Sequence, residues 1–233
     1  MNDNTKGFVS FVESLGGLDG PGLRTVFFLQ GCPARCVYCH NPETHAFEGG
    51  VEYSVQKILE VVDKYKAYYG VDGGVTFSGG EPLVQRDFVI ACAKALRQKN
   101  IHIALDTSGI LFDSDVYDAV DLVLLDIKHT DPTQYKSVIG VDFELDNTHK
   151  VIHYLNTNNI KFWARQVIVP TINDDHQNII KLKQLASNAQ KIELLPYHAM
   201  GKNKYEKLGK PYPDHLQEPS KELMQKLNTW LNE

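Results

Sequence analysis

Residues 24–42 read RTVFFLQGCPARCVYCHNP, and this stretch decides the predicted fold. Its first part, residues 24–30, is an apolar run rich in β-branched and aromatic residues, which is typical of a buried strand. The strand leads directly into three cysteines spaced as Cys32-x-x-x-Cys36-x-x-Cys39. A short loop with three thiolates can wrap around one inorganic centre and leave one coordination position open. An open position usually indicates chemistry at the centre.

The cysteine spacing is not typical of a disulfide framework, because three of the four cysteines lie within one short loop. A structural zinc site with His40 or a distant residue as fourth ligand is an alternative. Such sites usually pair one C-x-x-C with a second pair, and this sequence has no second pair. The fourth cysteine, Cys92, lies in a helical run, and we expect it to be a buried core residue.

Apolar patterns along the chain predict alternating strands and helices. The expected strands are residues 24–30, 74–77, 101–105, 122–127, 162–169 and 192–195. The expected helices are residues 54–69, 88–98, 145–156, 177–186 and 220–231. Nearly continuous apolar strands in such an alternation predict a parallel sheet that is covered by helices on its outer face. Six such units are too few for a closed eight-stranded barrel, so we expect an α/β fold, an open partial TIM-like (β/α)6 barrel, with residues 1–233 as a single domain.

Polar residues follow or interrupt these strands near the ends at which such folds collect their functional groups. The cysteine loop follows the first strand and a double glycine follows the second. The remaining strands carry, in order, Asp106 and Thr107, then Asp126 and Lys128, then Arg165 and His198. The sequence therefore predicts one site at one mouth of the barrel.

Composition and charge narrow the class of protein. The chain has 233 residues, of which 42% are hydrophobic and 23% charged, and this is typical of a globular protein rather than a fibrous or disordered one. A net charge of −5 argues against a nucleic-acid binder with a broad basic face. The sequence contains no apolar run near the ~20 residues of a membrane span, and residues 1–6 lack the apolar segment of a secretory signal. We therefore expect a cytoplasmic protein.

Six separated motifs between Phe8 and Trp230 resemble a known enzyme family. The cysteine triplet, with an aromatic residue before its last cysteine, resembles the signature of radical S-adenosylmethionine (SAM) enzymes, and residues 79–81 (GGE) resemble their methionine-binding motif. Residues 19–24 (DGPGLR) and 39–42 (CHNP) are similar to the glycyl-radical-enzyme activases. The short spacer before the next helix, without further cysteines, favours the pyruvate formate-lyase branch of that family.

The resemblance implies a [4Fe–4S] cluster whose metal ligands are Cys32, Cys36 and Cys39, with SAM on the fourth iron. It implies cofactor-binding roles for Tyr38, Cys39, His40, Gly79, Gly80, Glu81, Asp126, Lys128, Arg165 and His198. Asp126 is expected at a ribose hydroxyl or the amino group of SAM, Lys128 or Arg165 at its carboxylate, and His198 at the adenosine end. From the residues alone, a plain salt bridge between Asp126 and Lys128 is the alternative.

Three further roles are also implied by the resemblance. Asp106 and Thr107, helped by the carbonyl of Leu124, are expected to bind a monovalent cation, although alone they would be ordinary polar residues at a strand end. A loop beside the radical is expected to hold the substrate peptide through Asp19, Gly20, Gly22 and His40. Glu81 is expected either to orient its loop or to accept a hydrogen bond from SAM. The reaction is a hydrogen-atom abstraction, so we predict no catalytic acid or base.

The expected activity is abstraction of an α-hydrogen from a glycine of pyruvate formate-lyase, which gives a protein glycyl radical. The resemblance implies a flavodoxin-type reductant, and we expect a monomer without nucleic-acid or membrane partners. The alternatives are an activase of another glycyl radical enzyme, a radical SAM enzyme that acts on a small molecule, and a non-catalytic iron–sulfur sensing module.

Overall fold

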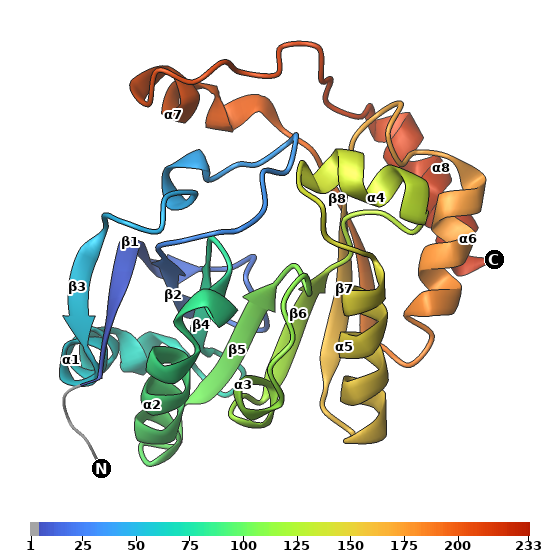
Figure 1. The fold of residues 1–233 in the computed structure, drawn as a ribbon. Helices are drawn as coiled ribbons and strands as arrows, with labels where there is room; N and C mark the ends of the chain where they lie inside the picture. The colour runs from blue at the N-terminus through green and yellow to red at the C-terminus, as the bar shows by residue number, and fades with distance from the viewer. Residues whose placement is uncertain (1–4) are drawn as a thin grey trace.

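The structure is a computed structural model that describes residues 5–233. One sheet of eight strands organises it, in the order β3-β1-β2-β4-β5-β6-β7-β8. Strands from β2 to β8 pair in parallel, curve, and do not close into a barrel (Figure 1). These parallel strands are β2 (Arg24–Leu29), β4 (Gly74–Gly79), β5 (His102–Thr107), β6 (Leu122–Asp126), β7 (Phe162–Ile168) and β8 (Lys191–Pro196). The prediction of an open, partial barrel with six parallel strands is confirmed.

Two antiparallel strands extend the sheet beyond the prediction. β1 (Lys6–Gly16) pairs with β2, and β3 (Val51–Ser54) pairs with the outer edge of β1. Both strands are partly exposed, so they lack the continuous apolar run by which the six parallel strands are recognised. The sheet is therefore mixed, and the cysteine loop continues into its antiparallel edge.

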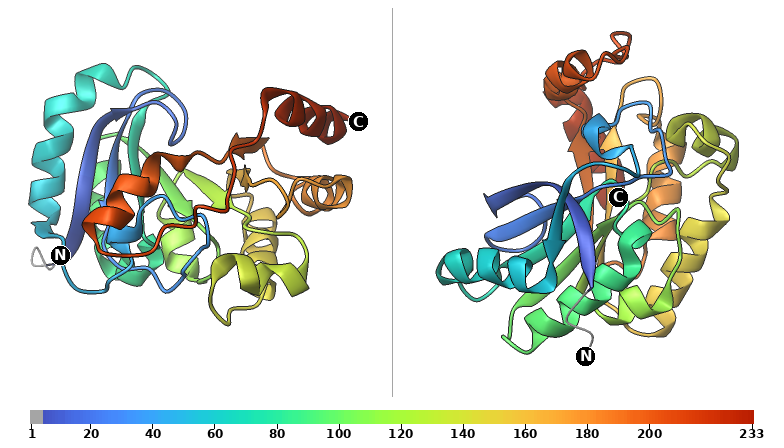
Figure 2. Two further views of the ribbon diagram at one scale, coloured as in Figure 1. Left: turned by 90° about the horizontal axis from the view of Figure 1, so that it is seen from above. Right: turned by 60° about the vertical axis from the view of Figure 1, so that its left-hand side comes forward.

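Five helices lie close to their predicted positions: α1 (Val55–Tyr65), α2 (Arg86–Arg97), α5 (Asp146–Thr157), α6 (His176–Leu185) and α8 (Lys221–Asn232). These helices flank the sheet (Figure 2). Their apolar side chains pack against it in one continuous core. Cys92 on α2 is fully buried in that core, as predicted. Three short helices were not predicted: α3 (Ser114–Asp118), α4 (Pro132–Ile139) and α7 (Lys202–Lys207).

Strand alternation separates the core from the site. Successive side chains of a strand point to opposite faces. On β6, Val123 and Leu125 pack into the helix-covered core, while Leu124 belongs to a small cluster on the inner face. The same period places Asp106 and Asp126 on the inner face, near the carboxyl ends of β5 and β6. Charged groups thus gather on the concave side.

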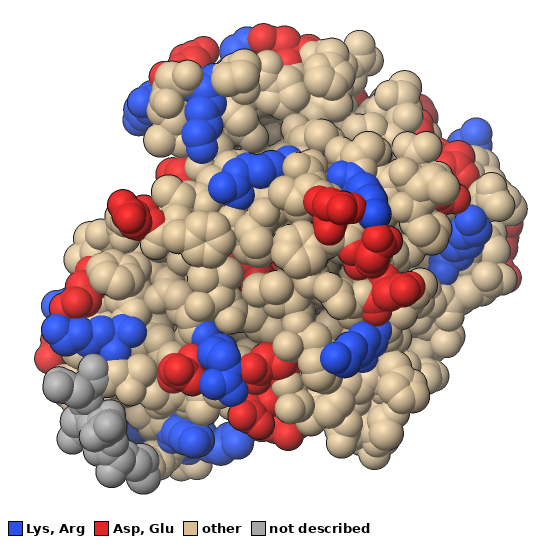
Figure 3. Space-filling view, viewed as in Figure 1, with Lys and Arg blue, Asp and Glu red and all other residues tan. Residues whose placement is uncertain are grey.

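Charges of both signs are mixed on the face of the molecule that Figure 3 shows. On the face in Figure 3, positive and negative side chains of the described residues are interspersed, and no continuous basic area is present. None of the helices between residues 5 and 233 combines the length and the apolar character that crossing a membrane requires.

Candidate functional site

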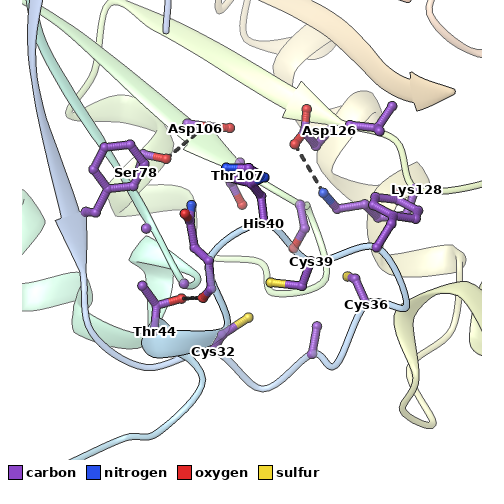
Figure 4. Close-up of a pocket in the computed structure, with 18 of the residues that line it drawn as sticks. Cys32, Cys36, Cys39, His40, Thr44, Ser78, Asp106, Thr107, Asp126 and Lys128 are labelled. Atoms are coloured by element: carbon purple, nitrogen blue, oxygen red, sulfur yellow. Dashed lines mark hydrogen bonds and ion pairs between the residues drawn. The ribbon is translucent and has the colours of Figure 1, made fainter. Parts of the chain in front are cut away.

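A cavity of about 280 Å³ lies where the cysteine loop meets the carboxyl ends of the parallel strands. It is lined by Cys32, Cys36 and Cys39 of the loop and by residues from the ends of β4, β5, β6 and β8. In Figure 4 the three cysteines border one side of this pocket, and Asp106, Thr107 and Asp126 lie across from them. The site forms at the single mouth that the strand order predicts.

Backbone hydrogen bonds fix the cysteine loop. Arg35 N donates to Ile139 O at 2.8 Å and Val37 N donates to Val138 O at 3.0 Å, so the end of α4 holds the loop on both sides of Cys36. Cys39 N donates to Cys36 O at 3.0 Å within the loop. The sulfurs are therefore presented by a backbone whose shape depends on main-chain contacts.

The three thiols lie where a proton is hard to remove. Burial raises the pKa of Cys32 to about 12 and that of Cys39 to about 11, and it also raises the pKa of Cys36. Thiolates form here when a cationic centre supplies compensating charge. This donor set fits an iron–sulfur cluster, because thiolates are the ligands that such clusters take.

The cysteine loop fits a site for one metal ion less well than it fits a cluster. Within residues 5–233, His, Cys, Asp and Glu side chains form no group of three or more that could hold one metal ion. A polynuclear cluster needs sulfurs spread around a larger body than a zinc ion. The structure therefore does not favour the zinc alternative with His40 as fourth ligand.

The glycine pair sits where the protein backbone leaves no room for a side chain. A Cβ on Gly79, whose φ is +126°, would lie 2.2 Å from Leu29 N, and a Cβ on Gly80 would lie 2.2 Å from Gly31 O. Gly80 N also donates to Leu29 O at 3.0 Å. Glycine is thus required here by the packing of β4 against β2 and the cysteine loop, and both glycines line the pocket.

Replacement of Gly79 by alanine is expected to lower the free energy of unfolding by about 3 kcal/mol. The positive φ costs about 1–3 kcal/mol for a residue with a Cβ, and the main chain of Leu29 has to move. Urea unfolding followed by circular dichroism measures the loss. Gly17→Ala is the control, since a Cβ there meets nothing within 4 Å. Equal stability of the two variants would contradict this account.

Glu81 is fully buried and is not part of the pocket lining. Its carboxylate accepts hydrogen bonds from Thr107 Oγ1 at 2.7 Å and from Ser108 N and Oγ at 3.0 and 2.6 Å. These contacts join the loop after β4 to the end of β5. Of its two expected roles, the geometry therefore favours orienting the loop.

A network of charged side chains crosses the inner face of the sheet. Arg165 donates from Nη2 to Asp106 Oδ1 at 2.6 Å and from Nε to Asp126 Oδ1 at 3.1 Å. Lys128 Nζ lies 3.1 Å from the other oxygen of Asp126, and Ser78 Oγ donates to Asp106 at 2.8 Å (Figure 4). The salt bridge between Asp126 and Lys128, which was the alternative to a role in SAM binding, is present as one part of a larger network.

The members of this charged network differ in whether they reach the pocket. Asp106, Asp126 and Lys128 line the cavity, whereas Arg165 is 5% exposed and does not line it. Burial opposes ionisation of Asp126, but attraction by Arg165 and Lys128 outweighs it and lowers the pKa of that carboxyl. Burial raises the pKa of Asp106 despite the attraction of Arg165. Arg165 thus acts on the pocket through the two carboxylates it holds.

The expected cation ligands, Asp106 and Thr107, both line the pocket. As neighbours on a strand they point to opposite faces. The hydroxyl of Thr107 is already engaged, since it donates to Glu81 and accepts from Gly109 N at 3.1 Å. Leu124, whose carbonyl was expected to help, pairs with Asp106 in the register of β5 and β6.

The turn between β1 and β2 holds the residues expected to bind peptide. Asp19 lines the pocket, whereas Gly20 and Gly22 do not. A Cβ on Gly22 would lie 2.5 Å from Gly73 N, so this glycine serves the packing of two turns. Arg24 is fully buried and donates to Thr76 Oγ1 and Val75 O, both at 2.7 Å, and to Pro21 O at 3.0 Å.

Asp19 gives the apo protein a distinct pH dependence. Burial, reinforced by Asp106, raises the pKa of Asp19 from 3.8 to about 6. Because the folded state then holds this proton more tightly than the unfolded state, ionisation of Asp19 costs stability as the pH rises from about 4 to about 6.

Replacement of Asp19 by asparagine is expected to remove that cost. The variant should match the parent near pH 4 and exceed its unfolding free energy by about 2 kcal/mol near pH 7. Urea titrations at the two pH values measure the difference. Asp72→Asn, at an exposed carboxylate, is the control. A difference that is the same at both pH values would argue against ionisation of Asp19 as its cause.

Two pocket residues carry buried polar atoms without a partner. Tyr38 Oη and His198 Nδ1 make no hydrogen bond within residues 5–233. Lys128 Nζ lies 5.8 Å from the centre of the Tyr38 ring, and His198 packs edge-on against His40 with ring centres 4.5 Å apart. Unsatisfied buried groups are rare, so these atoms fit a site completed by a polar ligand.

Contacts from α7 hold the cysteine loop and were not predicted. Tyr205 Oη on α7 donates to Cys39 O at 3.0 Å, and Lys204 Nζ lies 2.6 Å from Asn41 Oδ1 and 2.8 Å from Glu43. In Figure 1, α7 lies above the cysteine loop. Sequence separations above 160 residues leave no local signal for these contacts.

His45 is a further pocket residue that was not predicted. It lines the pocket six residues beyond Cys39, and its Nε2 lies 3.2 Å from Cys39 Sγ. Burial, with repulsion from Arg35 and Lys210, lowers the pKa of His45 to about 4. The available signal was a histidine close to the cysteine motif in the same loop.

Comparison with models of protein families shows the superfamily to which the chain belongs. The model of the Radical SAM superfamily matches residues 26–182, which is more than half of the chain. The match begins in β2 and includes the cysteine loop, the glycine pair and the charged network. The chain belongs to the radical SAM superfamily.

Within this superfamily the chain belongs to the family of pyruvate formate-lyase-activating enzymes. A relative of that name from Clostridium pasteurianum is 42% identical over 235 residues, which cover 97% of this chain and 98% of the relative. The pyruvate formate-lyase 1-activating enzyme of Escherichia coli K12 is 37% identical over 231 residues, which cover 95% of this chain and 93% of the relative.

Solved structures support the same architecture. A domain of pyruvate-formate lyase-activating enzyme from Bacteroides vulgatus is 28% identical, has a TM-score of 0.53, and covers 69% of this chain and 93% of its own. Streptococcus suis SuiB bound to precursor peptide SuiA has a TM-score of 0.67 at 16% identity, with 89% of this chain and 44% of that one covered. The second likeness concerns the fold alone.

Proposed function

We infer that this chain activates pyruvate formate-lyase by abstracting an α-hydrogen from a glycine of that protein, which leaves a glycyl radical. The observation that carries this inference is the placement of three half-buried thiols and a charged inner-face network around one pocket. Near-full-length relatives that bear the name of this activity support it.

The pocket residues fit a [4Fe–4S] cluster held by Cys32, Cys36 and Cys39, with SAM as the second bound group. When bound and reduced, the cluster supplies one electron to the SAM sulfonium, which yields methionine and a 5′-deoxyadenosyl radical. The protein contributes binding, orientation and exclusion of water. We assign no acid or base, because the substrate loses a hydrogen atom rather than a proton.

The polar lining is suited to the two ends of SAM. Lys128, paired with Asp126, offers a cation to a carboxylate, while Asp126 offers an acceptor to an amino group or a ribose hydroxyl. His198, with its unpartnered Nδ1, is proposed at the adenosine end. Gly79 and Gly80 expose their main chain to the same cavity.

The protein substrate has to bring a glycine into this pocket. Asp19 and His40 line it and are proposed to contact the peptide backbone around that glycine. Abstraction inside a pocket requires that the glycine-bearing segment leave its own fold, so the complex is expected to be transient.

Several further assignments are part of the proposal. A monovalent cation beside SAM is proposed at Asp106 and Thr107, because both line the pocket. A flavodoxin-type protein is proposed as reductant, since the reaction needs a strongly reducing one-electron donor. We propose that the chain acts as a monomer in the cytoplasm.

The test is anaerobic reconstitution with iron and sulfide, followed by addition of SAM, a reductant and pyruvate formate-lyase. A glycine-centred doublet in the electron paramagnetic resonance (EPR) spectrum of the partner, with release of deoxyadenosine, is the expected result. Deoxyadenosine without a protein radical would favour a small-molecule substrate. No deoxyadenosine after reduction would favour a sensing module.

A further inference from the structure

His45 makes a contact that the proposed function does not use. The residue is 7% exposed, and its Nε2 lies 3.2 Å from Cys39 Sγ. Within residues 5–233, no other side-chain nitrogen or oxygen forms a hydrogen bond with a cysteine sulfur. One of the three thiols is thereby distinguished from the other two.

The backbone around His45 is fixed on both sides. Gln30 Nε2, at the end of β2, donates to Ala46 O at 2.7 Å and to Glu43 O at 3.1 Å. Gly31 N donates to Thr44 O at 2.9 Å. These bonds anchor the segment to the strand that presents the cysteines, so the ring is held against Cys39 by the local fold.

The chemistry of a ligating thiolate decides the direction of this contact. A thiolate bound to metal carries no proton, so the contact is favourable when imidazole Nε2 donates to sulfur. Hydrogen bonds to the sulfurs of iron–sulfur clusters are among the factors that set their reduction potentials. A donor stabilises the reduced cluster more than the oxidised one, because reduction adds negative charge.

We propose that His45 is a positioning residue that donates Nε2–H to the sulfur of Cys39 and raises the reduction potential of the cluster. This proposal rests on the cluster of the proposed function. The proposal gives the imidazole of His45 a role in the cysteine loop. The other pocket-facing side chains of that loop are proposed to hold the cluster or to line the ligand cavity. The effect of His45 acts through Cys39 and needs no contact with SAM.

The test compares His45→Phe, which keeps a ring but loses the donor, with His45→Gln, which keeps an N–H at similar reach. Each protein is reconstituted anaerobically without SAM, assayed for iron, and titrated electrochemically with EPR detection of the reduced cluster. We expect full iron content in all three proteins. The Phe variant should show an about tenfold less favourable one-electron reduction, about 59 mV more negative, while the Gln variant keeps the parental potential.

Two outcomes would overturn the proposal. A parental potential in a fully loaded Phe variant would show that no hydrogen bond from His45 influences the cluster. Equal shifts in the Phe and Gln variants would assign the effect to the shape of the ring. A wild-type protein that takes up no cluster would instead contradict the proposed function, and this is seen before any variant is compared.

A second measurement needs no variant and covers the case in which the Phe variant does not fold. Wild-type protein labelled with ¹⁵N-histidine is reconstituted, reduced and studied by pulsed EPR. A hydrogen bond from Nε2 to a ligating sulfur predicts a weak ¹⁵N hyperfine coupling to the reduced cluster. Absence of that coupling in loaded protein would contradict the proposal.

Discussion

Replacement of Cys36 by alanine is expected to abolish glycyl-radical formation and to reduce the reconstituted iron to a small residue. Cys36 lies between the other two ligands and lines the pocket. Its loss leaves two thiols, which cannot hold a cubane with three occupied corners. Iron and sulfide assays, the visible spectrum of the reconstituted protein and the EPR doublet on pyruvate formate-lyase measure these effects.

The fold of the Cys36→Ala variant should survive, which separates the loss of the cluster from the loss of structure. The loop shape depends on the main-chain bonds of Arg35 and Val37 to the end of α4, and these do not involve the Cys36 side chain. Circular dichroism of the apo variant should therefore match the parent. A variant that still produced the radical with SAM and a reductant would show that the cluster is held elsewhere.

Cys92→Ala is the matched control for this experiment. Cys92 is fully buried in α2, away from the pocket, and removal of its sulfur leaves a small cavity that costs about 1 kcal/mol. Iron content and radical yield should remain parental. If both cysteine variants lost the radical equally, general destabilisation would be the simpler cause.

The parallel part of the fold was predictable because five of its six strands, β2, β4, β5, β6 and β7, are largely buried, whereas the edge strand β8 is partly exposed. The six apolar runs are recognised without knowledge of their partners, and their order fixes which strand ends meet. β1 and β3 were missed because their exposed positions break such a run. The sequence Phe8-Val9-Ser10-Phe11-Val12 does contain the β-branched and aromatic residues of a strand, so composition rather than continuity was the available signal.

The sequence predicts which residues lie in the site better than it predicts which of them form hydrogen bonds and ion pairs with each other. Asp106, Asp126 and Lys128 were expected in one place because strand ends of a parallel sheet meet at one mouth, and the structure brings them together there. That Arg165 bonds both carboxylates follows from register, since Asp126 and Arg165 are direct partners between β6 and β7. A single sequence does not specify register or long-range contacts such as those of α7.

Replacement of Arg165 by methionine is expected to lower the unfolding free energy of the apo protein by about 3–5 kcal/mol near pH 8. The guanidinium is 5% exposed and bonds two buried carboxylates. Its removal leaves the charges of Asp106 and Asp126 facing each other, with Lys128 as the remaining cation in contact with Asp126. Urea unfolding followed by circular dichroism measures this loss.

The loss of unfolding free energy in Arg165→Met should depend on pH, because the pKa values of Asp126 and Asp106 differ between the folded and unfolded states. In the parent, attraction by Arg165 and Lys128 lowers the pKa of Asp126, so this carboxylate contributes stability above its unfolded pKa and loses it as the pH falls. Without Arg165 the pKa values of Asp126 and Asp106 both rise. The variant then binds protons more tightly when folded than when unfolded, so its deficit shrinks toward pH 5.

Arg165→Lys separates charge from geometry. Lysine keeps the positive charge but cannot hold two carboxylates with two fixed donors, so we expect a deficit between the parent and Arg165→Met. The same order should hold for SAM binding measured by calorimetry on the reconstituted proteins, because Arg165 bonds Asp126, which lines the pocket together with Lys128. A methionine variant as stable as the parent at both pH values would mean that the network is dispensable for the fold.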